Sequence, residues 1–147
     1  MGPAGSGKST FAARHFKPTE VTSSDFFRAM VSDDEGDQSA SPAAFTLLRF
    51  LVTRRLRRRR RTCVDATNLH RRERRPLLRA AQTYRRPAIA VVFDLPLETC
   101  LERNRLRAGR RVEESVIREQ WAAAPRSPEP LLEEGFSVVY KVGPDDA

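Results

Sequence analysis

The first ten residues, MGPAGSGKST, carry the feature that most restricts how this chain can fold. Residues 2–9 complete the pattern G-x-x-x-x-G-K-[ST], a phosphate-binding loop that joins a strand to a helix. The glycines of such a loop let consecutive backbone N–H groups point at phosphates, and the helix adds the positive end of its dipole. The sequence therefore predicts a nucleotide site formed by Gly2, Gly5, Ser6, Gly7, Lys8, Ser9 and Thr10.

The side chains of this loop have separate expected roles. Lys8 should reach the β- and γ-phosphates of ATP, and the Ser9 hydroxyl should hold Mg²⁺. Thr10 adds a contact to the nucleotide. Only Met1 precedes the loop, although a buried strand normally leads into it. We therefore expect Met1 to be a misassigned start, with roughly ten or more further residues upstream that include a strand of about the usual length. The alternative is a remnant that binds ATP poorly or does not fold.

Apolar runs and helical patterns alternate along the rest of the chain. This order predicts one α/β domain over residues 1–147: a P-loop NTPase three-layer sandwich with a mostly parallel sheet, lacking the strand before the loop. Ser41 and Pro42 should be the N-cap and first turn of one helix, and Pro76 should delay or kink another. Strands are expected at residues 20–24, 62–65, 87–94 and 136–142, and helices at 11–16, 24–31, 42–60, up to about 84, 97–107 and 112–124.

Composition adds weaker limits. The 27 basic residues against 19 acidic ones give a net charge of +8, which favours a polyanionic partner such as nucleic acid. Nearly all the basic residues are arginines, a bias that GC-rich codon usage alone can produce, so the charge argues only weakly. No apolar run approaches the ~20 residues of a membrane span. Two cysteines without metal-ligand partners are typical of reduced thiols, so we expect a cytoplasmic protein with no membrane partner.

A second group of candidate residues follows the strands. Asp25, after the strand at 20–24, is placed to accept a proton from an attacking hydroxyl, and Arg28 would share its helix face. The alternative is an N-capping Asp with a solvated Arg. Asp65 resembles the acidic residue that ends a magnesium strand, or else it only forms the turn in DATN. Gln38 could contact an acceptor.

Arg103 and Arg107 are spaced to share one helix face before the basic turn at residues 108–111. Guanidinium groups on such a lid, at about residues 103–112, can close over a transferring phosphoryl group and neutralise its charge. The alternative is a solvated basic face.

The chain resembles the 5'-hydroxyl kinase module of bacterial polynucleotide kinase-phosphatase, an end-healing enzyme of RNA repair. The resemblance rests on GSGKSTFA, HFKPTEVTSSDFFRAMVSDDEGDQ, VDATN, and AVVFDLPLETCLERNRLRAGRRVEESVIREQ through EGFSVVY, and it covers almost the whole chain. It implies catalytic roles for Lys8, Asp25 and Arg103, with Arg107 also on the ATP phosphates and Arg28 on the acceptor's nearby phosphate.

This resemblance implies ATP-dependent phosphorylation of the 5'-hydroxyl ends of RNA or DNA, with Mg²⁺. The chain has no room for the phosphatase and ligase-like modules of the full enzyme, which separate components could supply. Two other functions stay open: a small-molecule or nucleotide kinase of similar fold, and an inactive ATP-binding remnant.

Overall fold

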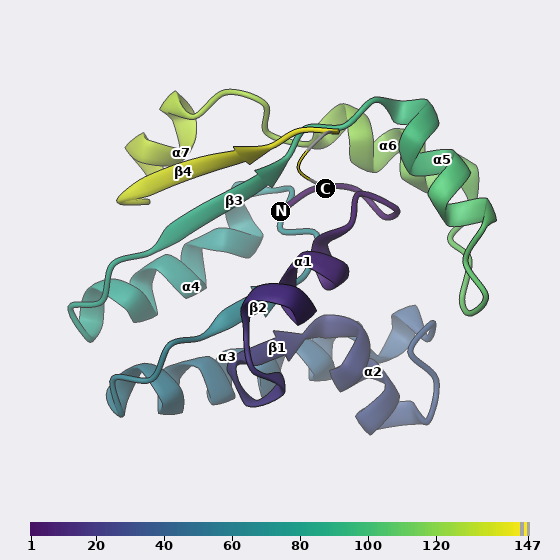
Figure 1. Cartoon of the computed structure of the whole chain (residues 1–147). Coiled ribbons are helices and arrows are strands. Elements are labelled where there is room, and N and C mark those ends of the chain that lie inside the picture. Colours follow the sequence, from purple (N-terminus) through teal and green to yellow (C-terminus); the bar gives the residue numbers. More distant parts are fainter. Residues whose placement is uncertain (145, 147) are drawn as a thin grey trace.

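Among the described residues, two pairs of parallel strands form two separate sheets of this α/β fold (Figure 1). The computed structural model describes residues 1–144 and 146. Strand β1 pairs with β2, and β3 pairs with β4. Short 3₁₀ turns at Pro18–Glu20 and Gln38–Ala40 precede β1 and α3. The elements are α1 (Lys8–His15), β1 (Val21–Ser23), α2 (Ser24–Ser32), α3 (Ser41–Arg57), β2 (Cys63–Asp65), α4 (Arg71–Thr83), β3 (Ile89–Phe93), α5 (Leu97–Arg105), α6 (Glu114–Ala123), α7 (Glu129–Glu134) and β4 (Val138–Val142).

The N-terminal residues lie between the two strand pairs. The Met1 ammonium donates to the Val91 carbonyl, and the Phe93 amide donates to the Met1 carbonyl at 2.9 Å. On the other side, the Gly2 amide donates to the Thr67 carbonyl just after β2, at 3.2 Å. Residues 1 and 2 therefore connect β3 to the segment that follows β2, where no ladder joins the two pairs in the described part of the chain.

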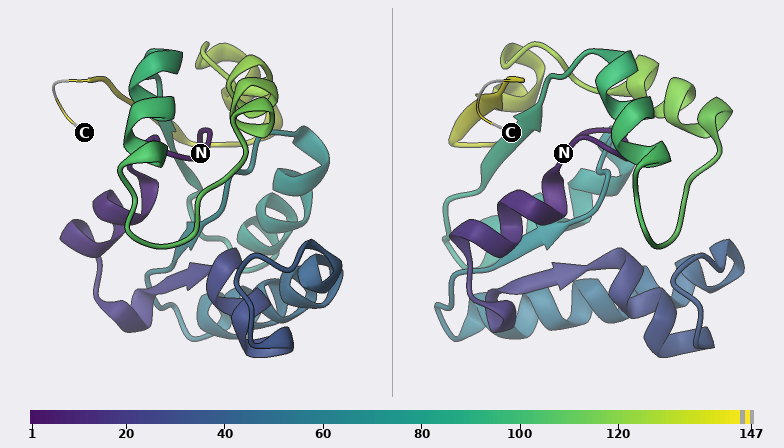
Figure 2. Two further views of the ribbon diagram at one scale, coloured as in Figure 1. Left: turned by 90° about the vertical axis from the view of Figure 1, so that its right-hand side faces the viewer. Right: turned by 45° about the vertical axis from the view of Figure 1, so that its right-hand side comes forward.

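Helices cover both sides of these strands (Figure 1; Figure 2). The core around α5 and α6 contains the fully buried Leu101 and Ile117, packed with Phe93 of β3 and Val142 of β4. Both faces of β3 contribute to the interior: Phe93 packs in this core, and Val92 packs in a second cluster with Leu131 of α7. This two-sided burial is why the segment reads as a continuous apolar run.

A buried ion pair holds the turn that follows β2. The guanidinium of Arg74 on α4 bonds both carboxylate oxygens of Glu134 on α7, at 2.8 and 2.6 Å. Its remaining nitrogen donates to the carbonyls of Asn68 and Leu69, at 3.0 and 2.6 Å. The side-chain hydrogen bonding between Arg74 and Glu134 lowers the pKa of the Glu134 carboxyl. Arg74 thus fixes the chain just beyond Asp65.

Several predicted boundaries need correction. Helix α1 begins at Lys8 rather than at residue 11, because the phosphate loop leads directly into it. Ser41 is the first residue of α3 and Ala40 is its N-cap, and the helix ends at Arg57. Helix α4 does not start late at Pro76: it begins at Arg71, where Glu73 bonds the backbone of His70, and it runs through the proline to Thr83. Helix α7 was not anticipated.

The predicted α/β class with parallel strands is confirmed. Among the described residues, no helix has the length and apolarity needed to cross a membrane.

Candidate functional site

The phosphate loop packs directly against α5. Gly5 has a φ of 78°, in the left-handed region. A Cβ at Gly5 would lie 2.2 Å from the carbonyl oxygen of Cys100, so no other residue fits there. The amide of Ala4 donates to Oε1 of Gln120 on α6 at 2.8 Å. The shape of the loop is therefore set by α5 and α6, and Gln120 is a contributor that the sequence did not indicate.

The Lys8 ammonium lies within the loop. Its Nζ donates to the Pro3 carbonyl at 2.7 Å and reaches the hydroxyl of the buried Ser6 at 3.4 Å. Burial lowers the pKa of Lys8 from 10.5 to about 8, although the charge of Asp65 acts in the opposite direction. The ammonium is thus held close to the loop backbone, where a phosphate would meet it.

Ser9 and Asp65 meet at the start of α1. The Ser9 hydroxyl donates to Oδ2 of Asp65 at 2.7 Å, which brings the end of β2 to the phosphate loop. A hydroxyl and a carboxylate are the oxygen ligands that Mg²⁺ uses beside substrate phosphates and waters, so this pair fits the ion. Thr10, one residue further on, is exposed on α1.

The register of β1 and β2 places Asp25 near this pair. Ser23 is the partner of Asp65 in the ladder, so the two strands end at the same edge. Ser23 caps α2 by accepting a bond from the Phe26 amide at 3.3 Å, which leaves Asp25 free of the capping role considered for it. Asp25 therefore lies in the first turn of α2, just beyond the strand edge that carries Asp65.

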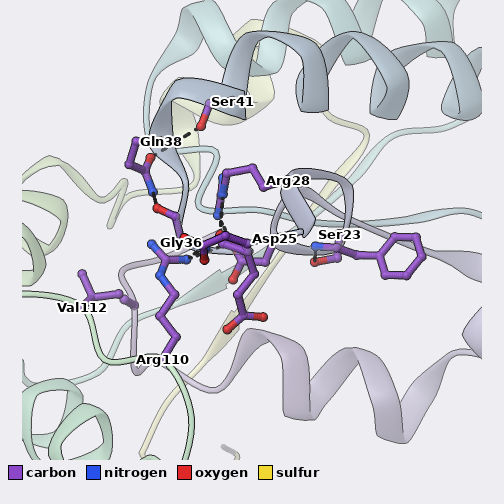
Figure 3. Close-up of polar contacts among 12 residues, drawn as sticks. Ser23, Asp25, Arg28, Gly36, Gln38, Ser41, Arg110 and Val112 are labelled. Atoms are coloured by element: carbon purple, nitrogen blue, oxygen red, sulfur yellow. Dashed lines mark hydrogen bonds and ion pairs between the residues drawn. The ribbon is translucent and has the colours of Figure 1, made fainter. Parts of the chain in front are cut away.

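Arg28 faces Asp25 on α2, as its spacing predicted. Its guanidinium forms an ion pair with Oδ1 of Asp25, and its Nε donates to the Glu35 carbonyl at 2.8 Å (Figure 3). The Arg28 side chain is 8% exposed and that of Asp25 is 41% exposed. Burial lowers the pKa of Arg28, and the positive charge of Arg110 adds to this effect. Arg28 is thus a fixed, buried cation beside an accessible carboxylate, not a solvated arginine.

Of the two lid arginines that were expected to share a helix face, only Arg103 lies in a helix. Arg103 is in the last turn of α5, and its Nη1 lies 3.4 Å from where a Cβ of Gly7 would be. Helix α5 ends at Arg105, so Arg107 does not share a helix face with Arg103. The helix stops there because Asn104 turns its side chain to the lid: Nδ2 donates to the Val112 carbonyl at 2.8 Å, and Oδ1 accepts from its amide at 2.9 Å.

Arg107 lies in the exposed lid loop, where its charge is one of those that lower the pKa of Lys8. Gln38, across from the lid, is exposed and bonds its own loop, with Nε2 donating to the Gly36 carbonyl at 3.4 Å and Oε1 accepting from Ser41 at 3.5 Å.

Arg110 is a lid residue for which the sequence predicted no specific role. Its Nη1 lies 3.5 Å from Oδ1 of Asp25 and donates to the Glu35 carbonyl at 3.2 Å (Figure 3). The segment from α5 through the lid thus places Arg103 beside Gly7 of the phosphate loop and brings Arg110 into contact with Asp25. The basic composition of the turn was a signal for a lid, but it could not distinguish Arg110 from its neighbours.

Comparison with known proteins identifies the family of this chain. The family model of an AAA domain, AAA_33, matches residues 1–131. No curated protein matches the chain. The matched range runs from the phosphate loop through both acidic strand ends and the lid to α7, so it contains the whole arrangement described above. The chain therefore belongs to this AAA domain family, which is a P-loop kinase-like family of nucleotide-binding domains.

Proposed function

We propose that this chain transfers the γ-phosphoryl group of ATP to the 5'-hydroxyl end of RNA or DNA. The observation that carries the proposal is the lid, which reaches the phosphate loop through Arg103 and the α2 carboxylate through Arg110. A kinase needs such a connection, because donor phosphates and acceptor hydroxyl must be held in line. The sequence resemblance supplies the acceptor class.

Asp25 has the properties of the group that would accept the hydroxyl proton. Its Oδ1 is held by Arg28 and Arg110, while Oδ2 has no hydrogen-bond partner within residues 1–144 and 146. The side chain is 41% exposed, so an acceptor can reach Oδ2. The ion pair orients the carboxylate, and the free oxygen takes the hydroxyl proton as the new O–P bond forms and the bond from the γ-phosphorus to ADP breaks.

Cationic side chains would balance the charge that moves during transfer. Lys8 lies within the phosphate loop and Arg103 lies beside Gly7 of that loop, where both would contact the phosphates of ATP. The Ser9 and Asp65 oxygens would hold Mg²⁺, which neutralises phosphate charge when bound. The contribution of the chain is therefore positioning and charge stabilisation.

The direct test is transfer of labelled γ-phosphate from ATP to a 5'-hydroxyl oligonucleotide. We expect activity in the wild type and a loss of about 10²- to 10⁴-fold in kcat for Asp25→Asn, which cannot take up the proton. The matched control is Asp33→Asn: Asp33 is exposed at the end of the same helix, with a φ of 59° that asparagine also adopts. Equal activity of wild type and Asp25→Asn would contradict the assigned base.

A panel of acceptors tests the substrate class. We expect 5'-hydroxyl oligonucleotides of RNA or DNA to be phosphorylated, with binding that weakens as salt increases, because phosphate contacts release counterions. Preference for free nucleotides or non-nucleotide alcohols would replace the proposal with a small-molecule kinase. Folded protein that binds ATP but phosphorylates nothing in the panel would indicate an inactive remnant.

A further inference from the structure

A side chain of α6 holds the backbone of the phosphate loop. Oε1 of Gln120 accepts a hydrogen bond from the amide of Ala4 at 2.8 Å. Gln120 lies three residues after the fully buried Ile117, so the two side chains share a face of α6. Ala4 also packs against the core cluster to which Ile117 belongs. Helix α6 thus contributes to the apolar packing of Ala4 and also binds its amide.

The amides of the loop fall into two groups. Two are occupied by the protein itself: that of Ala4 by Gln120, and that of Ser6 by a carbonyl of the loop at 3.3 Å. In the part of the chain that the structure describes, the amides of Gly5 and Gly7 have no hydrogen-bond partner. Free amides of this kind are the groups that bind phosphate oxygens. Gln120 therefore fixes the peptide unit that immediately precedes the first free amide, that of Gly5.

The next loop residue is held by α5, the other helix that carries the lid. A Cβ at Gly5 would lie 2.2 Å from the carbonyl oxygen of Cys100, so the backbone of α5 lies directly against the loop. The lid loop connects α5 to α6 (Figure 2). Its base is closed by Asn104 of α5, which bonds both backbone groups of Val112 just before α6. Two consecutive residues of the phosphate loop are therefore held by the two helices that support the lid.

The bond to Ala4 depends on the oxygen of the Gln120 side chain. A backbone N–H needs an acceptor, so the bond fixes which end of the Gln120 amide faces the loop. Ala4 and Gln120 are both half-buried, so an Ala4 amide without this oxygen would turn toward another acceptor. The Gly5 amide would move with it, because the two peptide units share the Cα of Ala4.

We infer that Gln120 is a positioning residue of the nucleotide site, which ties the phosphate loop to α6 so that ATP binding and the order of the lid depend on each other. The inference rests on the part of the proposed function that concerns ATP, and it does not depend on the acceptor. Phosphates bound at the loop restrain Ala4 and, through Gln120, the helix that follows the lid. The coupling is reciprocal, so an ordered lid also favours the loop shape that binds phosphate.

Equilibrium binding of ATP with Mg²⁺ to Gln120→Met tests the inference. Methionine keeps the length and helix propensity of glutamine, but its sulfur is only a weak acceptor. We expect Kd for ATP to rise about 5- to 100-fold, the usual range when an amide loses its partner. Gln82→Met is the matched control, because it makes the same change at an exposed position on α4 and should leave Kd unchanged.

Hydrogen exchange shows whether the loop itself responds. The Ala4 amide should be protected in the wild type and in Gln120→Glu, which keeps an acceptor oxygen, and should exchange faster in Gln120→Met. Saturating ATP should protect lid residues 106–112 in the wild type and protect them less in Gln120→Met. A side chain that only stabilised α6 would change neither the affinity for ATP nor this response of the lid.

Trp121 reports whether α6 stays packed in the variants. It is the single tryptophan of the chain, and its indole donates to the Leu95 carbonyl at 2.8 Å. We expect Gln120→Met to keep the tryptophan fluorescence of the wild type. If it does not, Gln120→Asn, whose side chain is one methylene shorter, takes its place in the same measurements.

Three results would overturn the inference. They are an unchanged Kd for ATP in the folded variant, a lid response to ATP equal to that of the wild type, and a wild type that binds no ATP. Failure to phosphorylate nucleic acid would contradict the proposed function alone, because none of these measurements uses an acceptor.

Discussion

Lys8 shows how the environment of one residue changes its chemistry. Its ammonium is enclosed by the phosphate loop, and burial lowers its pKa from 10.5 to about 8. The folded protein therefore releases this proton at a lower pH than the unfolded chain does. Between pH 8 and 10.5 the unfolded state binds more protons, so the free energy of unfolding should rise with pH across this window.

Lys8→Met should remove this dependence. We expect the stability of the wild type to increase relative to Lys8→Met by up to about 3 kcal/mol from pH 8 to pH 10.5, as the cost of burying the charge disappears. The wild type and Lys8→Met share all other titrating groups. One of these is the thiol of Cys63, and burial raises the pKa of that thiol to about 11. Urea unfolding at several pH values measures the difference, and parallel pH profiles would show that Lys8 is not buried as a cation.

The bond between Ser9 and Asp65 makes a prediction about Mg²⁺. Asp65→Asn weakens the carboxylate side of the pair, so the Mg²⁺ concentration needed for half-maximal nucleotide binding should rise about 10- to 100-fold. Ser9→Ala should also raise this Mg²⁺ concentration. The double variant should raise it little further, because each single change already disrupts the same pair of Mg²⁺ ligands. ATP binding titrated with Mg²⁺ provides the measurement, with Asp33→Asn as the control. Fully additive effects would mean that the two residues act separately.

At the scale of elements, the lid depends on a single buried amide. Asn104 is 3% exposed and makes both bonds that tie the end of α5 to Val112. We expect Asn104→Ala to loosen the loop that carries Arg107 and Arg110, and to lower stability by about 1 to 3 kcal/mol, because two backbone groups lose their partner. Hydrogen exchange should increase more in residues 106–112 than in β3, which responds only to the loss of global stability.

The surface ion pair of the same region is the control for this prediction. Arg105 and Glu114 join α5 to α6 at 2.6 Å, but both side chains are exposed. Glu114→Gln should therefore cost less than about 1 kcal/mol and leave exchange in the lid unchanged. Similar effects of the two variants would contradict the role of Asn104.

Elements were easier to predict from sequence than the contacts between them. The spacing of Asp25 and Arg28 correctly predicted that they share a helix face, because residues three apart on a helix are neighbours. The same logic failed for Arg103 and Arg107, because the bonds from Asn104 to Val112 end α5 before residue 107. Likewise, Pro76 does not set the start of α4, because the bond from Glu73 to the His70 backbone stabilises a first turn that begins at Arg71.

At the scale of the whole molecule, the strands form two separate ladders, with Met1 and Gly2 between them. Strands β2 and β3 each have a partner on one side only, in the part of the chain that the structure describes. Amides of β2 and β3 that face the gap should therefore exchange about tenfold or more faster than those bonded within a ladder, with Phe93 as an internal control because its amide bonds Met1. Hydrogen exchange read by NMR tests this, and uniform protection would contradict the division of the sheet.

The sequence by itself determined the phosphate loop and the pairing of Asp25 with Arg28, because each depends on residues close together in the chain. The α/β class also followed from the sequence, because strand and helix patterns alternate along the chain and that order favours parallel strands. A loop motif and a helical spacing are local, and local geometry can be read from residue order. Only the tertiary structure decided that Ser9 meets Asp65, that α5 and α6 shape the loop through Cys100 and Gln120, and that Arg110 reaches Asp25. Those contacts join segments far apart in sequence, and the packing of several elements at once sets their distances.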